Sequence, residues 1–76
     1  MEELMELLQA LKPEIDFETE QELIDDGLLE SFDVITLIAE IEDQFGVEIP
    51  AEEIVPENLN SAEGIRNLIQ RIREEE

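Results

Sequence analysis

Hydrophobic residues recur at helical spacing in three stretches of the chain. Within each stretch they fall three or four positions apart, so a helix would carry them all on one face. The three sets are Leu4, Leu7, Leu8 and Leu11, then Val34, Leu37, Ile38, Ile41 and Phe45, and finally Ile65, Leu68, Ile69 and Ile72. The pattern predicts three amphipathic helices, each of which needs the others to cover its apolar face.

The first two helices have clear stop signals. Pro13 cannot continue a helix, so the first helix should end near Lys12. The second is expected to span about residues 32–45 and to end at Gly46, which can adopt the left-handed conformation that closes many helices. On the side of this helix opposite its apolar stripe, the sequence places mostly acidic residues.

The third helix is preceded by a segment with weaker signals. Residues 51–55 can form one short turn before Pro56 interrupts it. The helix itself should open at Asn60 or Ser61, both favoured N-cap residues, and Asn60 with Glu63 has the spacing of a reciprocal cap.

The connection over residues 13–30 is long for so small a domain, so its own side chains must anchor it. Thr19 and Glu22 have the spacing of a capping box, which predicts a helical turn running to Ile24 before residues 25–27 (Asp-Asp-Gly) break it. We expect four apolar residues to pin this connection to the core. They are Leu23, Ile24, Leu28 and Leu29.

No hairpin signal lies between alternating apolar and polar runs, so the sequence predicts an all-α fold. Three main helices and one short helix can enclose a single core only as a compact four-helix bundle. Residues 1–76 are therefore expected to form one domain, without repeats or low-complexity segments.

Composition narrows the possible chemistry. The chain has 23 acidic and 4 basic residues, a net charge of −19, and neither His nor Cys. It therefore lacks a thiol nucleophile, an imidazole base and the usual zinc ligands, and we expect neither enzyme activity nor a tuned metal site. A surface this acidic repels nucleic acids and anionic membranes, so a basic protein surface is the natural partner.

The beginning of the sequence lacks the cationic start and apolar run of a secretory signal, and no stretch has the length of a membrane span. These features favour a cytoplasmic protein, expected to be a monomer.

Among its few hydroxyl groups, Ser31 stands out because it precedes the second helix. Its structural role would be the N-cap, and its functional role would be an accessible point for covalent modification.

Residues 27–37 (GLLESFDVITL) and 41–50 (IEDQFGVEIP) resemble the acyl carrier protein family. That family has a D-S-L or D-S-F element at the start of its second helix, followed by an I/L-E-x-x-F-x-x-x-I-P run. The resemblance covers about residues 20–73. It departs at Glu30, where the family usually has Asp; because that carboxylate assists the metal of the modifying enzyme in the family, the longer side chain bears on how efficiently the serine is modified.

The resemblance implies that Ser31 receives 4'-phosphopantetheine from coenzyme A, transferred by a holo-synthase (phosphopantetheinyl transferase). Acyl groups would then travel as thioesters on the thiol of this arm, and the cofactor rather than the protein would supply the reactive atom. Glu30, Asp33, Glu40 and Asp43 resemble the acidic face that such carriers present to basic patches of partner enzymes. Phe32 is expected to be a partly exposed apolar contact beside the arm, or else a satellite of the core.

Three functions stay open at this point. The first is an acyl carrier for fatty-acid or related lipid synthesis. The second is a D-alanyl, aminoacyl or peptidyl carrier loaded by an adenylating ligase, suggested by residues 25–32 (DDGLLESF). The third is an unmodified acidic helical adaptor in which Ser31 only caps a helix.

Overall fold

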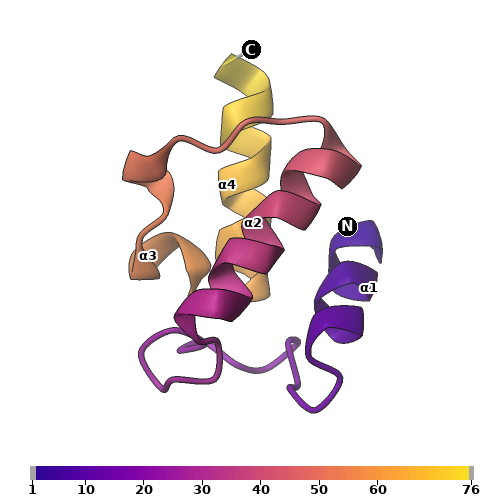
Figure 1. The fold of residues 1–76 in the computed structure, drawn as a ribbon, viewed down its shortest axis with the longest axis vertical. Helices are drawn as coiled ribbons and strands as arrows, with labels where there is room; N and C mark the ends of the chain where they lie inside the picture. The colour runs from indigo at the N-terminus through magenta and orange to yellow at the C-terminus, as the bar shows by residue number, and fades with distance from the viewer. Residues whose placement is uncertain (1, 76) are drawn as a thin grey trace.

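The computed structural model describes residues 2–75, and within them the backbone forms four α-helices and one 3-10 helix. The predicted all-α fold, with three longer helices and a short one, is confirmed for this part of the chain (Figure 1). The elements are α1 (Glu2–Leu11), α2 (Ser31–Phe45), the 3-10 helix η1 (Ala51–Glu53), α3 (Pro56–Leu59) and α4 (Ala62–Glu75).

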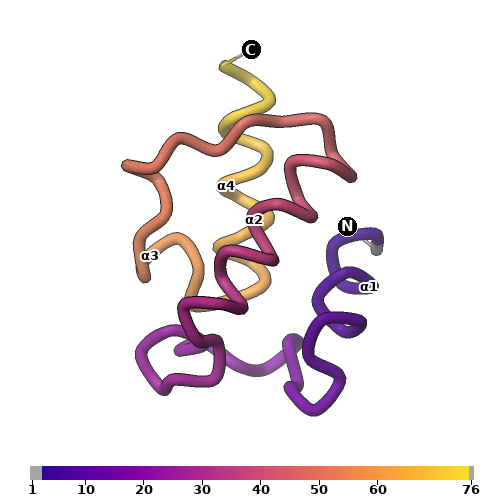
Figure 2. Tube along the Cα trace, in the orientation of Figure 1, coloured from indigo at the N-terminus to yellow at the C-terminus, as the bar shows by residue number. Residues whose placement is uncertain are grey.

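The three longer helices form the body of the bundle. Helix α1 packs against both α2 and α4, and the short α3 packs against α4. Figure 2 shows that the α1–α2 connection runs below one end of the bundle, whereas the chain after α2 crosses the opposite end. The start of α2 therefore lies at the same end of the molecule as the long first connection.

A single apolar core joins all three predicted stripes. Ten of their members are buried, and Leu11, Val34 and Phe45 pack against the core while partly exposed. Burial of one Leu or Ile side chain stabilises a fold by about 1.5–3 kcal/mol, so these stripes supply most of the driving force for folding. The buried members are Leu4, Leu7, Leu8, Leu37, Ile38, Ile41, Ile65, Leu68, Ile69 and Ile72.

The helical turn predicted from Thr19 is wrong. Asp16 organises this part of the chain instead, because its backbone carbonyl accepts hydrogen bonds from the amides of Thr19 (3.3 Å) and Glu20 (3.1 Å). Its side chain also accepts from the amide of Glu18 at 3.2 Å. An Asp side chain that bonds to nearby amides offers the backbone an alternative to a helix, which explains why the capping-box spacing fails here.

Apolar side chains do anchor the connection, as predicted. Leu23 and Leu29 are buried, and Ile24 and Leu28 pack against the core while partly exposed. Two further anchors were not predicted, Ile15 and Phe17, both of which are buried. Because six side chains hold it, residues 13–30 form an ordered wall of the bundle without any helix of their own.

The chain after α2 follows the predictions only in part. Gly46 ends the helix as expected, with a φ of 66° and its amide bonded to the carbonyl of Glu42. The short turn predicted at residues 51–55 is η1, but Pro56 begins α3 rather than interrupting a helix. Proline suits the first position of a helix because the amide hydrogen that it lacks has no partner there.

The start of α4 is capped by Ser61, whose hydroxyl accepts a hydrogen bond from the Gly64 amide at 3.0 Å. The predicted reciprocal cap between Asn60 and Glu63 is wrong. The Asn60 side chain reaches the first connection instead, where its amide oxygen accepts from the amides of Ile24 (2.9 Å) and Asp25 (3.1 Å). Asn60 therefore ties the chain just before α2 to the junction of α3 and α4.

Candidate functional site

Ser31 is the first residue of α2 and its side chain is exposed. The prediction that it caps the helix is wrong by one residue. Glu30 is the N-cap, with extended backbone angles (φ −91°, ψ 171°), and its carbonyl accepts the first helical hydrogen bond, from Val34, at 2.9 Å. Among the hydrogen bonds formed by residues 2–75, none uses the Ser31 hydroxyl, so that oxygen is available for chemistry.

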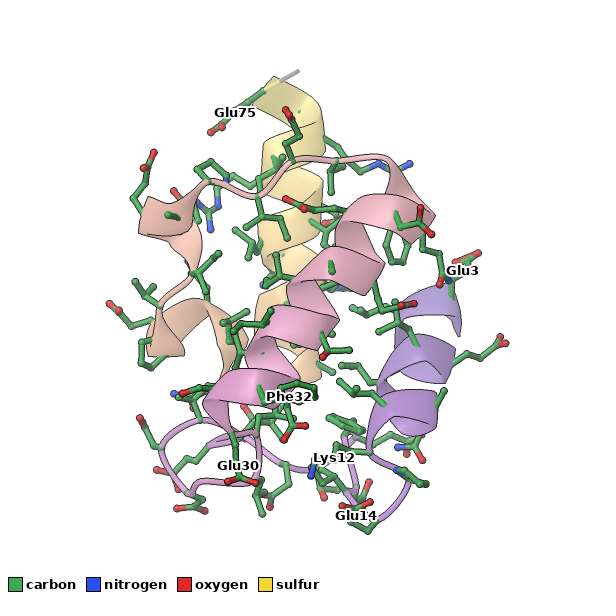
Figure 3. All side chains as sticks on the ribbon, viewed as in Figure 1. Glu3, Lys12, Glu14, Glu30, Phe32 and Glu75 are labelled. Atoms are coloured by element: carbon green, nitrogen blue, oxygen red, sulfur yellow. The ribbon has the colours of Figure 1, made fainter. Side chains whose placement is uncertain are left out.

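Asp33, three residues after the N-cap, contributes to the cap through its side chain. Its Oδ2 atom accepts a hydrogen bond from the Glu30 amide at 3.1 Å, which satisfies a donor at the helix start. The same oxygen lies 3.3 Å from Nζ of Lys12, the residue that follows α1, and Lys12 also lies 3.6 Å from Glu14. Figure 3 shows Lys12 and Glu30 at the same end of the molecule.

These contacts shift the titration of both groups. The pKa of Asp33 lies below its usual value, mainly because the Glu30 amide bonds to the ionised carboxylate and additionally because Lys12 is close; partial desolvation opposes the shift. The pKa of Lys12 is raised, first of all by its hydrogen bond to Asp33. The pair therefore favours the charged forms of both side chains.

Two large apolar side chains are exposed beside Ser31. Phe32 is 78% exposed and Ile35, one turn further along α2, is 69% exposed. The expected exposure of Phe32 is confirmed, and its alternative placement under the preceding connection is wrong. The exposure of Ile35 was not predicted, although its position three residues after Phe32 and outside the buried stripe was a usable signal.

An open cleft of about 840 Å³ adjoins the start of α2. It lies between the first turns of this helix and the segment that contains α3, and Ser31 is one of its lining residues. Most of its lining is apolar, so it can shelter a small apolar group next to the Ser31 hydroxyl. The apolar side chains of its walls include Ile24, Leu29, Val34, Ile54, Val55 and Pro56.

The acidic residues predicted to meet partners do not form one uniform surface. Glu30, Glu40 and Asp43 are exposed, and the last two lie further along α2 than Ser31. The Asp33 side chain is only 16% exposed and is already bound to Lys12. The structure thus brings Glu30, Phe32 and Asp33 into the same turn as Ser31 and leaves Glu40 and Asp43 as a separate outer pair.

The family model described as the phosphopantetheine attachment site matches residues 2–72. The chain belongs to this family. The match includes the first three helices and most of α4, so it covers both the fold and the site. Comparisons with curated proteins and with solved structures gave no match.

Membership in the phosphopantetheine attachment-site family implies a covalently attached 4'-phosphopantetheine, as the resemblance in the sequence indicated. Carrier domains of this kind interact with modifying and partner enzymes and are not themselves catalysts. The residues present fit the cofactor: an exposed hydroxyl starts a 15-residue helix, whose positive N-terminal end favours a phosphate ester.

Within residues 2–75, no helix has both the length and the apolar character needed to cross a membrane.

Proposed function

We propose that this protein is an acyl carrier whose 4'-phosphopantetheine arm is attached to Ser31. The observation that carries the proposal is the exposed Ser31 at the start of α2, where it lines a mostly apolar cleft. In the attachment reaction, the Ser31 oxygen bonds to the phosphorus that bears the pantetheine group of coenzyme A. The phosphoanhydride bond of coenzyme A breaks, adenosine 3',5'-bisphosphate leaves, and the transferase accepts the hydroxyl proton.

Once attached, the arm supplies the thiol that the sequence lacks, on which cargo is held as a thioester. The protein contributes no catalytic group to this chemistry and acts by presentation. A tethered cargo meets each docked enzyme at a raised effective concentration. The apolar lining of the cleft beside Ser31 supports an acyl cargo, as in fatty-acid or related lipid synthesis, over an amino acid.

Partner recognition is expected to use two kinds of side chain on α2. The exposed carboxylates of Glu30, Glu40 and Asp43 attract basic patches of partner enzymes, and the net charge of −19 speeds the encounter. Phe32 and Ile35 add apolar contact area beside the attachment point. Charge attraction with limited apolar contact suits a carrier, which must bind quickly and leave quickly.

Attachment is tested by incubating the protein with coenzyme A, Mg²⁺ and a broad-specificity phosphopantetheinyl transferase, followed by intact-mass measurement. The wild type should gain one phosphopantetheine, and Ser31→Ala should gain none. Ser61→Ala is the matched control, since it removes the only other serine, which caps α4. No gain in the wild type with any transferase, or a gain in Ser31→Ala, would support the unmodified adaptor or another attachment site.

The cargo is tested on the modified protein. Fatty-acyl loading systems and amino-acid adenylating ligases are supplied in parallel, and thioester formation is followed by mass. An acyl thioester is the expected product. Formation of only an aminoacyl thioester would favour the alternative suggested by residues 25–32, in which an adenylating ligase loads the arm.

A further inference from the structure

Lys12 has an unusual position among the cationic residues of the chain. The other three are Arg66, Arg71 and Arg73, all on α4, whereas Lys12 directly follows α1. Its amide donates to the carbonyl of Leu8 at 3.0 Å, so its backbone is fixed to the end of that helix. Its side chain is only 22% exposed and points across to the start of α2. The one Lys or Arg side chain outside α4 is thus held against the helix that begins with Ser31.

The contact partner of Lys12 is also the capping residue of α2. Asp33 Oδ2 is shared between Nζ of Lys12 at 3.3 Å and the Glu30 amide at 3.1 Å. The second of these bonds closes a loop of chain from Glu30 to Asp33, and Ser31 lies inside that loop. Lys12, Asp33 and the Glu30 amide therefore form a continuous polar link that ends one residue before the hydroxyl.

We propose that Lys12 is a positioning residue for the modification of Ser31, acting through Asp33 on the first turn of α2. This inference rests on the proposed attachment at Ser31. The first turn of a helix is the part most ready to fray, because its amides lack helical partners. Exposed ion pairs on their own stabilise little, but here the pair orients a carboxylate that also bonds to the backbone. Without Lys12, nearby acids such as Glu30 repel that carboxylate, and Ser31 is presented to the transferase in fewer molecules.

The test compares the transferase kinetics of Lys12→Met, Lys12→Arg and the wild type. Met keeps the length of the side chain and removes its charge, whereas Arg restores the charge. We expect kcat for Lys12→Met to fall about twofold, the change that loss of one exposed ion pair produces in an equilibrium, because the bond from the Glu30 amide to Asp33 remains. Lys12→Arg should recover most of this loss, and KM should not rise in either variant because Glu40 and Asp43 are untouched.

Arg73→Met is the matched charge control. It also removes one positive charge, but from the last turn of α4, whose end lies opposite Lys12 and Glu30 in Figure 3. Its kcat should equal that of the wild type. Equal kcat values for Lys12→Met and the wild type, or equal losses in Lys12→Met and Arg73→Met, would overturn the positioning role.

A double-mutant cycle with Asp33→Asn tests whether Lys12 acts through Asp33. Adding Lys12→Met to Asp33→Asn should lower kcat no further; an additional twofold loss would contradict the proposed route. Hydrogen exchange of the Glu30 amide gives a readout that needs no transferase: it should be faster in Lys12→Met than in the wild type and normal in Arg73→Met. An unmodified wild type would refute attachment, whereas modification with unchanged kcat and unchanged exchange in Lys12→Met would refute positioning alone.

Discussion

The two ends of α2 are held in different ways. At its C-terminal end, Gly46 closes the helix, and the next apolar residues, Val47 and Ile49, turn into the core. The amide of Ile49 then bonds to the Glu42 carboxylate at 2.9 Å, which folds the chain back on the helix. At the N-terminal end, polar contacts to Asp33 hold the first turn, and Phe32 and Ile35 remain exposed.

Under the proposed function, this difference assigns stability and partner recognition to different ends of a single helix. The C-terminal end uses its apolar residues for folding, so few are left for a partner. The first turn at the N-terminal end is held by hydrogen bonds and one ion pair in addition to the packing of Val34 against the core, and two large apolar side chains and one hydroxyl stay on the surface. A high net charge keeps such a surface soluble. Phe32 and Ile35 are therefore on the surface without any apolar residue being taken from the core.

The sharpest test of this separation uses the same substitution at two positions of α2. Ile41→Ala removes a side chain with no exposed surface and should lower the free energy of unfolding by about 2–5 kcal/mol. Ile35→Ala removes one that is 69% exposed and should change it by less than about 0.5 kcal/mol. Urea unfolding followed by circular dichroism measures both, and similar losses would show that the two ends are not distinct.

The second test concerns the connection that leads into the N-terminal end. Asn60→Ala removes the acceptor of the Ile24 and Asp25 amides and should destabilise the protein by about 1–3 kcal/mol. Asn67→Ala, at an exposed position of α4, is the control and should have little effect. Urea unfolding gives both values. If Asn60→Ala were as mild as the control, buried side chains alone would order the connection.

Asn60 also shows where sequence reasoning reaches its limit. The apolar stripes were predicted correctly because helical spacing is a local pattern and every stripe needs cover. The bonds of Asn60 join residues 35 and 36 positions apart, and no local pattern contains that information. The same holds for Lys12, whose partner Asp33 lies beyond the whole first connection.

The candidate site was predictable to a similar degree. Ser31 and the exposure of Phe32 followed from the motif and the helical wheel, but the identity of the N-cap did not. Ser and Glu are adjacent, and the choice depends on whether Asp33 can reach back to the Glu30 amide. Pro56 was misread for a related reason, since proline both ends and begins helices and only the surrounding chain decides which.

A third, smaller effect is the response of the protein to salt, which should differ between the whole molecule and the N-terminal end of α2. Raising NaCl from about 0.01 to 0.5 M, or adding millimolar Mg²⁺, screens the repulsion that accompanies the net charge of −19. The melting temperature should rise by about 4–8 °C, which corresponds to ~1 kcal/mol for a domain of this size. An unchanged melting temperature would exclude strong self-repulsion.

The same salt series should act in the opposite direction on the first turn of α2. Screening weakens the attraction between Lys12 and Asp33, so the Glu30 amide should exchange faster relative to core amides such as that of Ile41. Proportional slowing of both amides would mean that the ion pair does not contribute to the order of this turn.

The smallest expected effect is the dependence of stability on pH at Asp33. Folding lowers the pKa of this carboxylate below its unfolded value of about 4, so the ionised group stabilises the fold above that pH. This contribution is lost as the pH falls through the lower, folded pKa. The stability difference between the wild type and Asp33→Asn should therefore stay constant from pH 7 to about 4 and then close.

Repeating this pH series with Lys12→Met as the parent protein separates the two causes of the shift. The Glu30 amide is the larger cause of the lowered pKa and remains in Lys12→Met. The stability difference between Lys12→Met and the double variant with Asp33→Asn should therefore still close at acid pH, but by a smaller amount. Complete loss of the pH dependence would show that Lys12 is the main support of the ionised Asp33 carboxylate. An unaltered pH dependence would show that Lys12 does not affect the pKa of Asp33. The first outcome would mean that the N-terminal end of α2 depends chiefly on a screenable ion pair, whereas the expected one assigns most of its order to the backbone hydrogen bond.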